Sequence, residues 1–230
     1  MPRRRVAGAT DRYSDAVSEQ AAVRSATPVR VAFTALAVLG AWAVVGQAIQ
    51  SVSEGRSLVN YFSYFTIQSN LLVLITAVAV AVRGRLEGWW QPAYVAGVVG
   101  IVITGVVFHL LLAGQQTLEG ISVWYDLVLH TLVPIGAVAG FLLLRPRLDR
   151  RAWWFLVWPV AWAAYTLVRG AIADPRFPGP EGEAPMPVPY DFLDADSLGY
   201  GQVALTLTVI AVFTLVIGGA VIGISRRIAR

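Results

Sequence analysis

The sequence predicts an all-α integral membrane protein, a single bundle of six transmembrane helices with both termini in the cytoplasm. Three observations support this prediction: the composition, the number of long apolar runs, and the distribution of arginine between the loops. Of the 230 residues, 57% are hydrophobic and only 14% are charged, and the mean hydropathy is +0.63. These values lie far from those of ordinary soluble domains.

Six runs are long enough to cross a bilayer, which takes roughly 20 mostly apolar residues. In chain order they are 29–50, 61–82, 92–113, 124–144, 152–169 and 202–223. They divide the chain into a membrane domain over 29–223 and two basic ends, 1–28 and 224–230. The first end has no apolar core of the length that a cleavable signal requires, and we expect a disordered cytoplasmic tail.

The charges indicate the orientation of the bundle. The chain has no lysine, and fifteen of its eighteen basic residues lie on the side of the two termini. The other side has Arg56, Arg169 and Arg176. By the positive-inside rule both termini are predicted to be cytoplasmic, so the basic charge faces anionic lipid and not a nucleic acid. The Ala-, Val-, Gly- and Arg-rich composition is typical of a high-GC bacterial gene, which predicts the inner membrane.

The longest loop, 170–201, lies on the outer side in this arrangement. It contains six of the twelve prolines, and the chain has no cysteine that could form disulfides or thiolate sites. A loop of this length is expected to be either a functional lid or a flexible linker. Its last part, "PYDFLDADSLGYG", is apolar and aromatic enough to pack on the helices, which favours a lid.

The second run opens with the unusually polar stretch "YFSYFTIQSN", residues 61–70. On a regular helix Ser63, Thr66, Ser69 and Asn70 fall within an arc of about 120°, while Gln68 points elsewhere. This pattern predicts a polar pocket that opens to the outer half of the membrane. The competing interpretation is that the hydroxyls only bond to carbonyls of their own helix.

The two histidines of the chain, His109 and His130, both lie inside predicted spans. Ionisable side chains at such depth are costly and often functional, although an interhelical hydrogen bond would also account for them. At 1.5 Å per residue, Thr66 and His130 lie roughly 8 and 9 Å below the outer edge. His109 belongs to the same layer. Two further candidates for substrate binding, on the fifth run, are Tyr165 and Arg169.

The fourth run contains two residues that bear on His130. Asp126 precedes it by four residues, where a carboxylate would orient the imidazole, and Pro134 follows it by four and leaves its carbonyl without a helical partner. Thr66, His130 and Asp126 are therefore the components of an activated-nucleophile site. Candidate donors to an oxyanion are Asn70, Ser63 and Arg169.

Several short motifs carry a resemblance. The blocks are "YFTIQSNLL", "DLVLHT" followed by a proline, "YTLVRG", and "PYDFLD" followed by "GYG". In these blocks the chain resembles the family of androgen-induced gene 1 protein and androgen-dependent TFPI-regulating protein, and most of all its six-helix bacterial relatives. The resemblance implies an intramembrane threonine hydrolase of fatty acid esters, with Thr66 as nucleophile and His130 as general base. The chain departs from the animal members at Asp126, where these have asparagine.

Three functions are therefore open. The first is a lipid ester hydrolase that acts on a membrane lipid or fatty acid ester and needs no metal or cofactor. The second is a haem-binding redox protein with His109 and His130 as axial ligands, although bundles of that kind normally hold two haems and four histidines. The third is a lipid-binding or structural membrane protein without catalysis.

Overall fold

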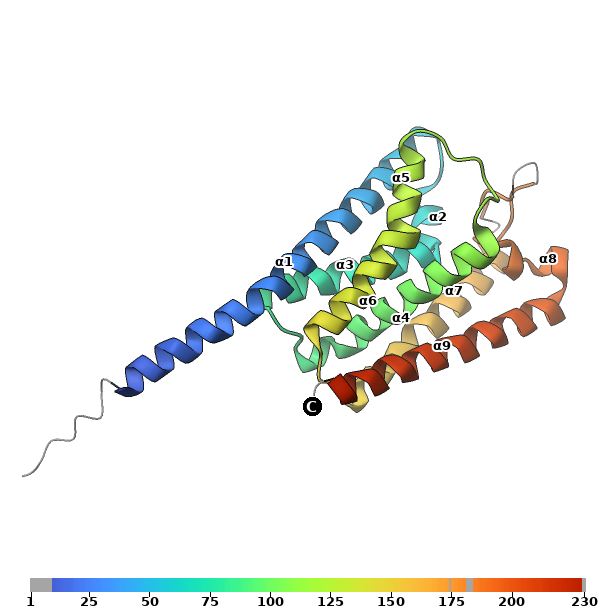
Figure 1. Ribbon diagram of the computed structural model, residues 1–230. Coiled ribbons are helices and arrows are strands. Elements are labelled where there is room, and N and C mark those ends of the chain that lie inside the picture. Colours follow the sequence, from blue (N-terminus) through green and yellow to red (C-terminus); the bar gives the residue numbers. More distant parts are fainter. Residues whose placement is uncertain (1–9, 174, 181–183, 229–230) are drawn as a thin grey trace, which may run out of the picture.

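A computed structural model describes residues 10–173, 175–180 and 184–228, with side chains from residue 26 onward. The prediction of six long apolar helices is confirmed, and the described chain forms a helical bundle with no β-strand (Figure 1). The membrane-length segments are Ala26–Ser53, Phe65–Arg83, Gly88–Leu112, Ile121–Leu144, Arg150–Ala173 and Tyr200–Ile228. The α-helices are α1 (Thr10–Ser53), α2 (Leu58–Ser63), α3 (Phe65–Arg83), α4 (Gln91–Val107), α5 (Ile121–Leu127), α6 (Val133–Leu144), α7 (Val157–Ala173), α8 (Ala195–Leu198) and α9 (Tyr200–Ile228).

Five tighter or wider helical segments complete the chain. Three are 3₁₀ helices: η1 (Gly88–Trp90), η4 (Arg150–Leu156) and η5 (Asp191–Leu193). Two are π-helical: η2 (Phe108–Leu112) ends the third membrane-length segment, and η3 (Val128–Leu132) interrupts the fourth.

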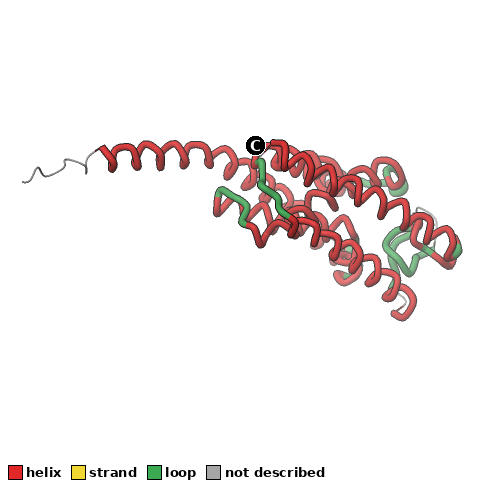
Figure 2. Tube along the Cα trace, turned by 90° about the horizontal axis from the view of Figure 1, so that it is seen from below, coloured by secondary structure: helices red, strands yellow, loops and turns green. Residues whose placement is uncertain are grey.

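Helix α1 begins well before the predicted span. Its backbone is helical from Thr10, so the part of 1–28 that is described differs from the disordered tail that we expected; residues 1–9 lie outside the described chain. The stretch "AVSEQAAVRSA" consists largely of good helix formers, so a helix nucleated in the membrane segment extends toward the N-terminus at little cost. Figure 2 shows this part of α1 projecting from the bundle, and Figure 1 shows that it leaves the bundle at the same end at which α9 terminates.

Helix α4 is the centre of the bundle. It contacts α3, α6, α7 and α9, and 56% of its most apolar window is buried, more than in any other membrane-length segment. Its sequence is almost free of large polar groups, and Val95 and Ile101 are completely buried. The functional side chains are therefore supplied by the elements around α4 and not by its middle.

Glycines allow the close helix contacts. A Cβ at Gly97 of α4 would lie 3.1 Å from the backbone nitrogen of Val73 on α3, so these two helices meet backbone to backbone. Gly140 of α6 instead leaves room for a side chain, since a Cβ there would lie 3.1 Å from the ring of Phe33 on α1. Gly223 of α9 has no neighbour within 4 Å of such a Cβ, so α9 makes no comparable contact there.

The predicted second span is broken at Tyr64, whose ψ of 134° separates α2 from α3. The break leaves carbonyls of α2 without helical partners, and side chains replace these partners. Gln68 donates to the carbonyl of Phe62 at 3.0 Å, and the Trp162 indole donates to that of Ser63 at 2.9 Å. Gln68, which pointed away from the predicted polar arc, thus stabilises the break.

The segment after α7 packs on the bundle. Phe177 and Met186 pair through two backbone hydrogen bonds of 2.9 Å, and Tyr190 and Leu193 are buried against α7 and α9. Two polar contacts fasten the segment to other elements: the Asn60 amide donates to the Arg176 carbonyl at 2.7 Å, and Gln115 donates to Asp191 at 3.2 Å. The described part of this loop is an ordered cover, as the apolar ending "PYDFLD" predicts.

Candidate functional site

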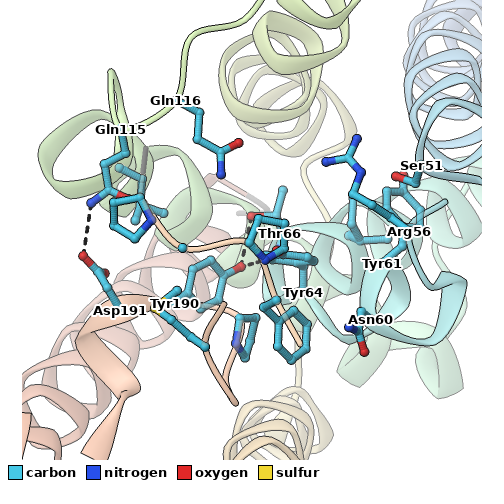
Figure 3. Close-up of a pocket in the computed structure, with 18 of the residues that line it drawn as sticks. Ser51, Arg56, Asn60, Tyr61, Tyr64, Thr66, Gln115, Gln116, Tyr190 and Asp191 are labelled. Atoms are coloured by element: carbon cyan, nitrogen blue, oxygen red, sulfur yellow. Dashed lines mark hydrogen bonds between the residues drawn. The ribbon is translucent and has the colours of Figure 1, made fainter. Parts of the chain in front are cut away.

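A cavity of about 890 Å³ lies at one end of the bundle, and the C-terminal end of α9 lies at the other. Its walls come from the link between α1 and α2, the link between η2 and α5, and the loop that follows α7. Thr66 from the first turn of α3, Asp126 from α5 and His130 from η3 all line it. Figure 3 shows other residues that line this cavity, among them Ser51, Arg56, Asn60, Tyr61, Tyr64, Gln115, Gln116, Tyr190 and Asp191.

His130 is held by two neighbours, Asp126 at one edge of the ring and Phe108 on one face. Its Nδ1 lies 2.9 Å from a carboxylate oxygen of Asp126 and 3.1 Å from the Asp126 carbonyl. Its ring stacks on Phe108, with centroids 3.9 Å apart and an angle of 12° between the planes. Because both oxygens accept, Nδ1 carries the proton and Nε2 is the basic nitrogen.

The π-helical turn determines how His130 is presented. Pro134 has no N–H for the His130 carbonyl, and the N–H of Val133 instead donates to the carbonyl of Val128, five residues back. Gly105 of α4 leaves space for this wide turn, since a Cβ there would lie 3.3 Å from the His130 carbonyl oxygen. Single π-helical turns inside α-helices are frequent at functional sites.

Thr66 contacts Tyr190 of the covering loop. The hydroxyl oxygen of Tyr190 accepts the backbone N–H of Thr66 at 3.2 Å and lies 3.3 Å from the Thr66 hydroxyl (Figure 3). Burial raises the pKa of Tyr190, so the phenol stays protonated at neutral pH and remains a hydrogen-bond donor. The break at Tyr64 makes this contact possible, because it places Thr66 in a first helical turn whose N–H groups have no helical acceptor.

A second hollow of about 440 Å³ adjoins the cavity. It runs between α4, α7 and α9 and is lined almost entirely by apolar side chains. Three residues line both hollows: Thr66, Leu112 and Tyr190. The Thr66 hydroxyl therefore lies where a polar space meets an apolar one.

The Asn70 side chain connects two helical elements. Its amide N–H groups donate to the carbonyls of Thr66 at 2.9 Å and Leu129 at 3.3 Å, which ties α3 to η3. Because both of its donors are used in this way, they are not available to an oxyanion. The Asn70 side chain is 1% exposed, and its amide oxygen is buried without a partner.

Ser63, Tyr165 and Arg169 form a separate cluster between α2 and α7. The Ser63 hydroxyl lies 2.9 Å from the Tyr165 hydroxyl and accepts from Arg169 at 3.2 Å. Arg169 also donates to Asn60 at 2.6 Å, and Asn60 lines the cavity. The three predicted residues thus support the cavity wall through Asn60 and do not belong to the described lining.

Two more candidates lie away from the cavity. Ser69 donates to the carbonyl of Phe65, as hydroxyls that bond to their own helix do, and it accepts from Thr104 of α4. His109 is exposed, and its Nε2 lies 3.0 Å from the Thr131 hydroxyl. The ring of Phe108 contacts both imidazoles, with centroids 5.1 Å from His109 and 3.9 Å from His130. One aromatic ring thus contacts both histidines.

Tyr190 and Asn60 are the contributions that sequence reasoning missed. The block "PYDFLD" predicts packing of the loop, but nothing in its spacing relates the Tyr190 hydroxyl to Thr66, 124 residues earlier. Within the described residues no group of three or more His, Cys, Asp or Glu side chains is arranged to hold a metal ion. The chain matches no family model, and comparisons with curated proteins and with solved structures also give no match.

Proposed function

We propose that the protein is an intramembrane hydrolase of lipid esters, with Thr66 as nucleophile and His130 as general base. The observation that supports this most directly is that Thr66 and the His130–Asp126 pair, which come from different helices, line one cavity. The resemblance in the sequence implies the same pair of residues. A hydroxyl, an imidazole and a carboxylate are the groups that acyl transfer requires.

The reaction has two steps. The Thr66 oxygen attacks the ester carbonyl carbon while Nε2 of His130 takes its proton; the carbon–oxygen bond of the ester then breaks, and the leaving alcohol takes that proton from His130. In the second step His130 removes a proton from water, which attacks the carbonyl carbon of the acyl-threonine. The bond between this carbon and the Thr66 oxygen then breaks, the Thr66 oxygen takes the proton from His130, and the fatty acid is released. Asp126 accepts a hydrogen bond from Nδ1 throughout and stabilises the imidazolium.

Tyr190 is the proposed donor to the oxyanion. Its oxygen accepts the Thr66 N–H, which leaves its own proton free to donate next to the Thr66 hydroxyl. Two donors that the sequence predicts are less suitable. The side-chain amide of Asn70 already donates to two carbonyls, and the Arg169 guanidinium already donates to Ser63 and Asn60. Loss of a single oxyanion donor typically slows acyl transfer by roughly 10²–10³-fold.

The proposed location is the inner membrane of a bacterium, with both termini in the cytoplasm. Most arginines lie in the loops at the end of the bundle where α9 terminates, and by the positive-inside rule this supports the orientation. The cavity then opens toward the outer leaflet, and ester substrates enter from there.

Labelling with a fluorophosphonate tests the proposal, because such probes modify activated hydroxyls. We expect labelling of the purified protein, its loss in Thr66→Ala and in His130→Gln, and its retention in the control Thr208→Ala, an exposed threonine of α9. Equal labelling of Thr66→Ala would remove Thr66 as nucleophile. If the unmodified protein is not labelled and His130→Gln only lowers thermal stability, the non-catalytic alternative is correct.

A further inference from the structure

The apolar hollow between α4, α7 and α9 has walls that cannot form hydrogen bonds with a ligand along most of its length. Two of its polar residues, Thr104 and Thr214, donate their hydroxyl protons to Ser69 and to the Ile210 carbonyl, and the Trp162 indole donates to Ser63. The other lining side chains are mostly aliphatic or aromatic. Such a surface selects hydrocarbon by burial of apolar area alone.

This hollow opens sideways toward the membrane. Val160 of α7 and Leu215 of α9 line it and are still 67% and 48% exposed. Only 17% and 22% of the most apolar windows of these two segments are buried, so both helices present most of their surface to lipid. A hydrocarbon chain can therefore enter from the bilayer without passing through water.

The larger cavity has the opposite character. Amides and hydroxyls of Gln47, Ser51, Asn60, Gln115 and Gln116 line it. Three of its charged side chains already have partners inside the protein: Arg56 pairs with Glu54, the Asp126 carboxylate lies beside Nδ1 of His130, and Asp191 accepts from Gln115 and from the Phe192 N–H. A space that is rich in hydrogen-bonding groups, and whose charged side chains already have partners, favours an uncharged polyhydroxyl group over an ionic one.

From the junction of these two spaces at Thr66, we infer that the protein binds a single-chain amphiphile, with its acyl chain in the α4–α7–α9 hollow and an uncharged polyhydroxyl head in the cavity. The chemical class is a monoacyl ester of glycerol or of a sugar. The inference rests on the proposed function only in placing the ester bond at Thr66. Tyr190 and Leu112 form the passage between chain and head.

Equilibrium binding to the Thr66→Ala protein tests the inference without catalysis. We expect radiolabelled monododecanoylglycerol to bind, and we expect methyl dodecanoate and dodecanoyl-lysophosphatidylglycerol to compete at least tenfold less well. Ala211→Trp, which fills the hollow from α9, should weaken binding at least tenfold. Ala220→Trp, the same change at an exposed position of α9 outside the described lining, should leave it unchanged.

Three results would overturn the inference: equal affinity for the methyl ester, tighter binding of the lysophospholipid, or unchanged binding in Ala211→Trp. Its failure is distinct from that of the proposed function. If monododecanoylglycerol binds as expected but Thr66 is never labelled by the fluorophosphonate, the amphiphile site stands and the hydrolase is wrong. If Thr66 is labelled but Ala211→Trp binds normally, the hydrolase stands and the acyl-chain site is wrong.

Discussion

His130 contacts two different groups of Asp126, the charged side-chain carboxylate and the uncharged backbone carbonyl. The carboxylate lies 2.9 Å from Nδ1, and the Asp126 carbonyl lies 3.1 Å from the same atom. The carbonyl and the stacked Phe108 would keep the ring oriented without the carboxylate. In the proposed acyl transfer, the negative charge of Asp126 adds stabilisation of the imidazolium.

Asp126→Asn should therefore slow the reaction without abolishing it. A hydrogen bond to a charged group contributes about 1.5–3 kcal/mol, which corresponds to about a 10- to 100-fold lower rate of Thr66 labelling. Single-turnover labelling with the fluorophosphonate measures this rate. The matched control is Glu87→Gln, which removes a carboxylate from the link between α3 and η1, far from the cavity. An unchanged rate in Asp126→Asn would show that the carboxylate has no part in the reaction.

At the scale of elements, the π-helical turn η3 links Pro134 to the position of His130. An alanine at 134 would restore the N–H that can donate to the His130 carbonyl and would favour a regular α-helix. Since each residue of an α-helix turns by about 100°, loss of the wide turn would rotate the residues before it relative to α6.

Pro134→Ala is expected to lower fluorophosphonate labelling at least tenfold while the protein stays folded and monodisperse in size-exclusion chromatography. The control is Pro92→Ala, because Pro92 lies in the first turn of α4, where a missing N–H costs no helical bond. Normal labelling in Pro134→Ala would show that labelling does not depend on the π-helical turn.

The contact of α3 with α4 is the second feature at this scale. Gly97→Val would force the valine side chain against the backbone of Leu72 and Val73, and backbone cannot move aside as a side chain can. Overpacking of this kind costs about 1–3 kcal/mol. We expect a thermal midpoint several degrees lower, measured by tryptophan fluorescence in detergent. Gly223→Val, where a Cβ meets no neighbour, should change it little, and an equal loss in both variants would contradict the packing argument.

At the scale of the whole molecule, the cavity and the end of α9 lie at opposite ends of the bundle. This polarity makes orientation testable, and the chain has no cysteine to interfere with a labelling experiment. In intact cells a membrane-impermeant maleimide should label Glu119→Cys, beside the cavity end, and should not label Arg85→Cys, in the loop after α3. The physical reason is that arginine-rich loops stay on the cytoplasmic side. The reverse pattern would place the cavity in the cytoplasm.

The number and approximate positions of the membrane helices follow from the sequence because hydropathy is a local property. A run such as 92–113 must be a helix in a bilayer, where every backbone group needs an internal partner. The i to i+4 relation of Asp126 and His130 is local in the same sense, and the 2.9 Å contact between them is what that spacing predicts. Depth along neighbouring helices placed Thr66 and His130 in one layer, and both line the same cavity.

Only the tertiary structure decided which polar side chains face that cavity. The break at Tyr64 turns Ser63 toward Tyr165 and leaves Thr66 at the junction of two spaces, and no regular helical wheel contains such a break. The contact of Tyr190 with Thr66 joins residues 124 positions apart. Helix rotation and loop docking depend on the packing of the whole bundle. The sequence by itself therefore determined the membrane-spanning architecture and the local contact of Asp126 with His130, while the fold determined which other side chains line the cavity.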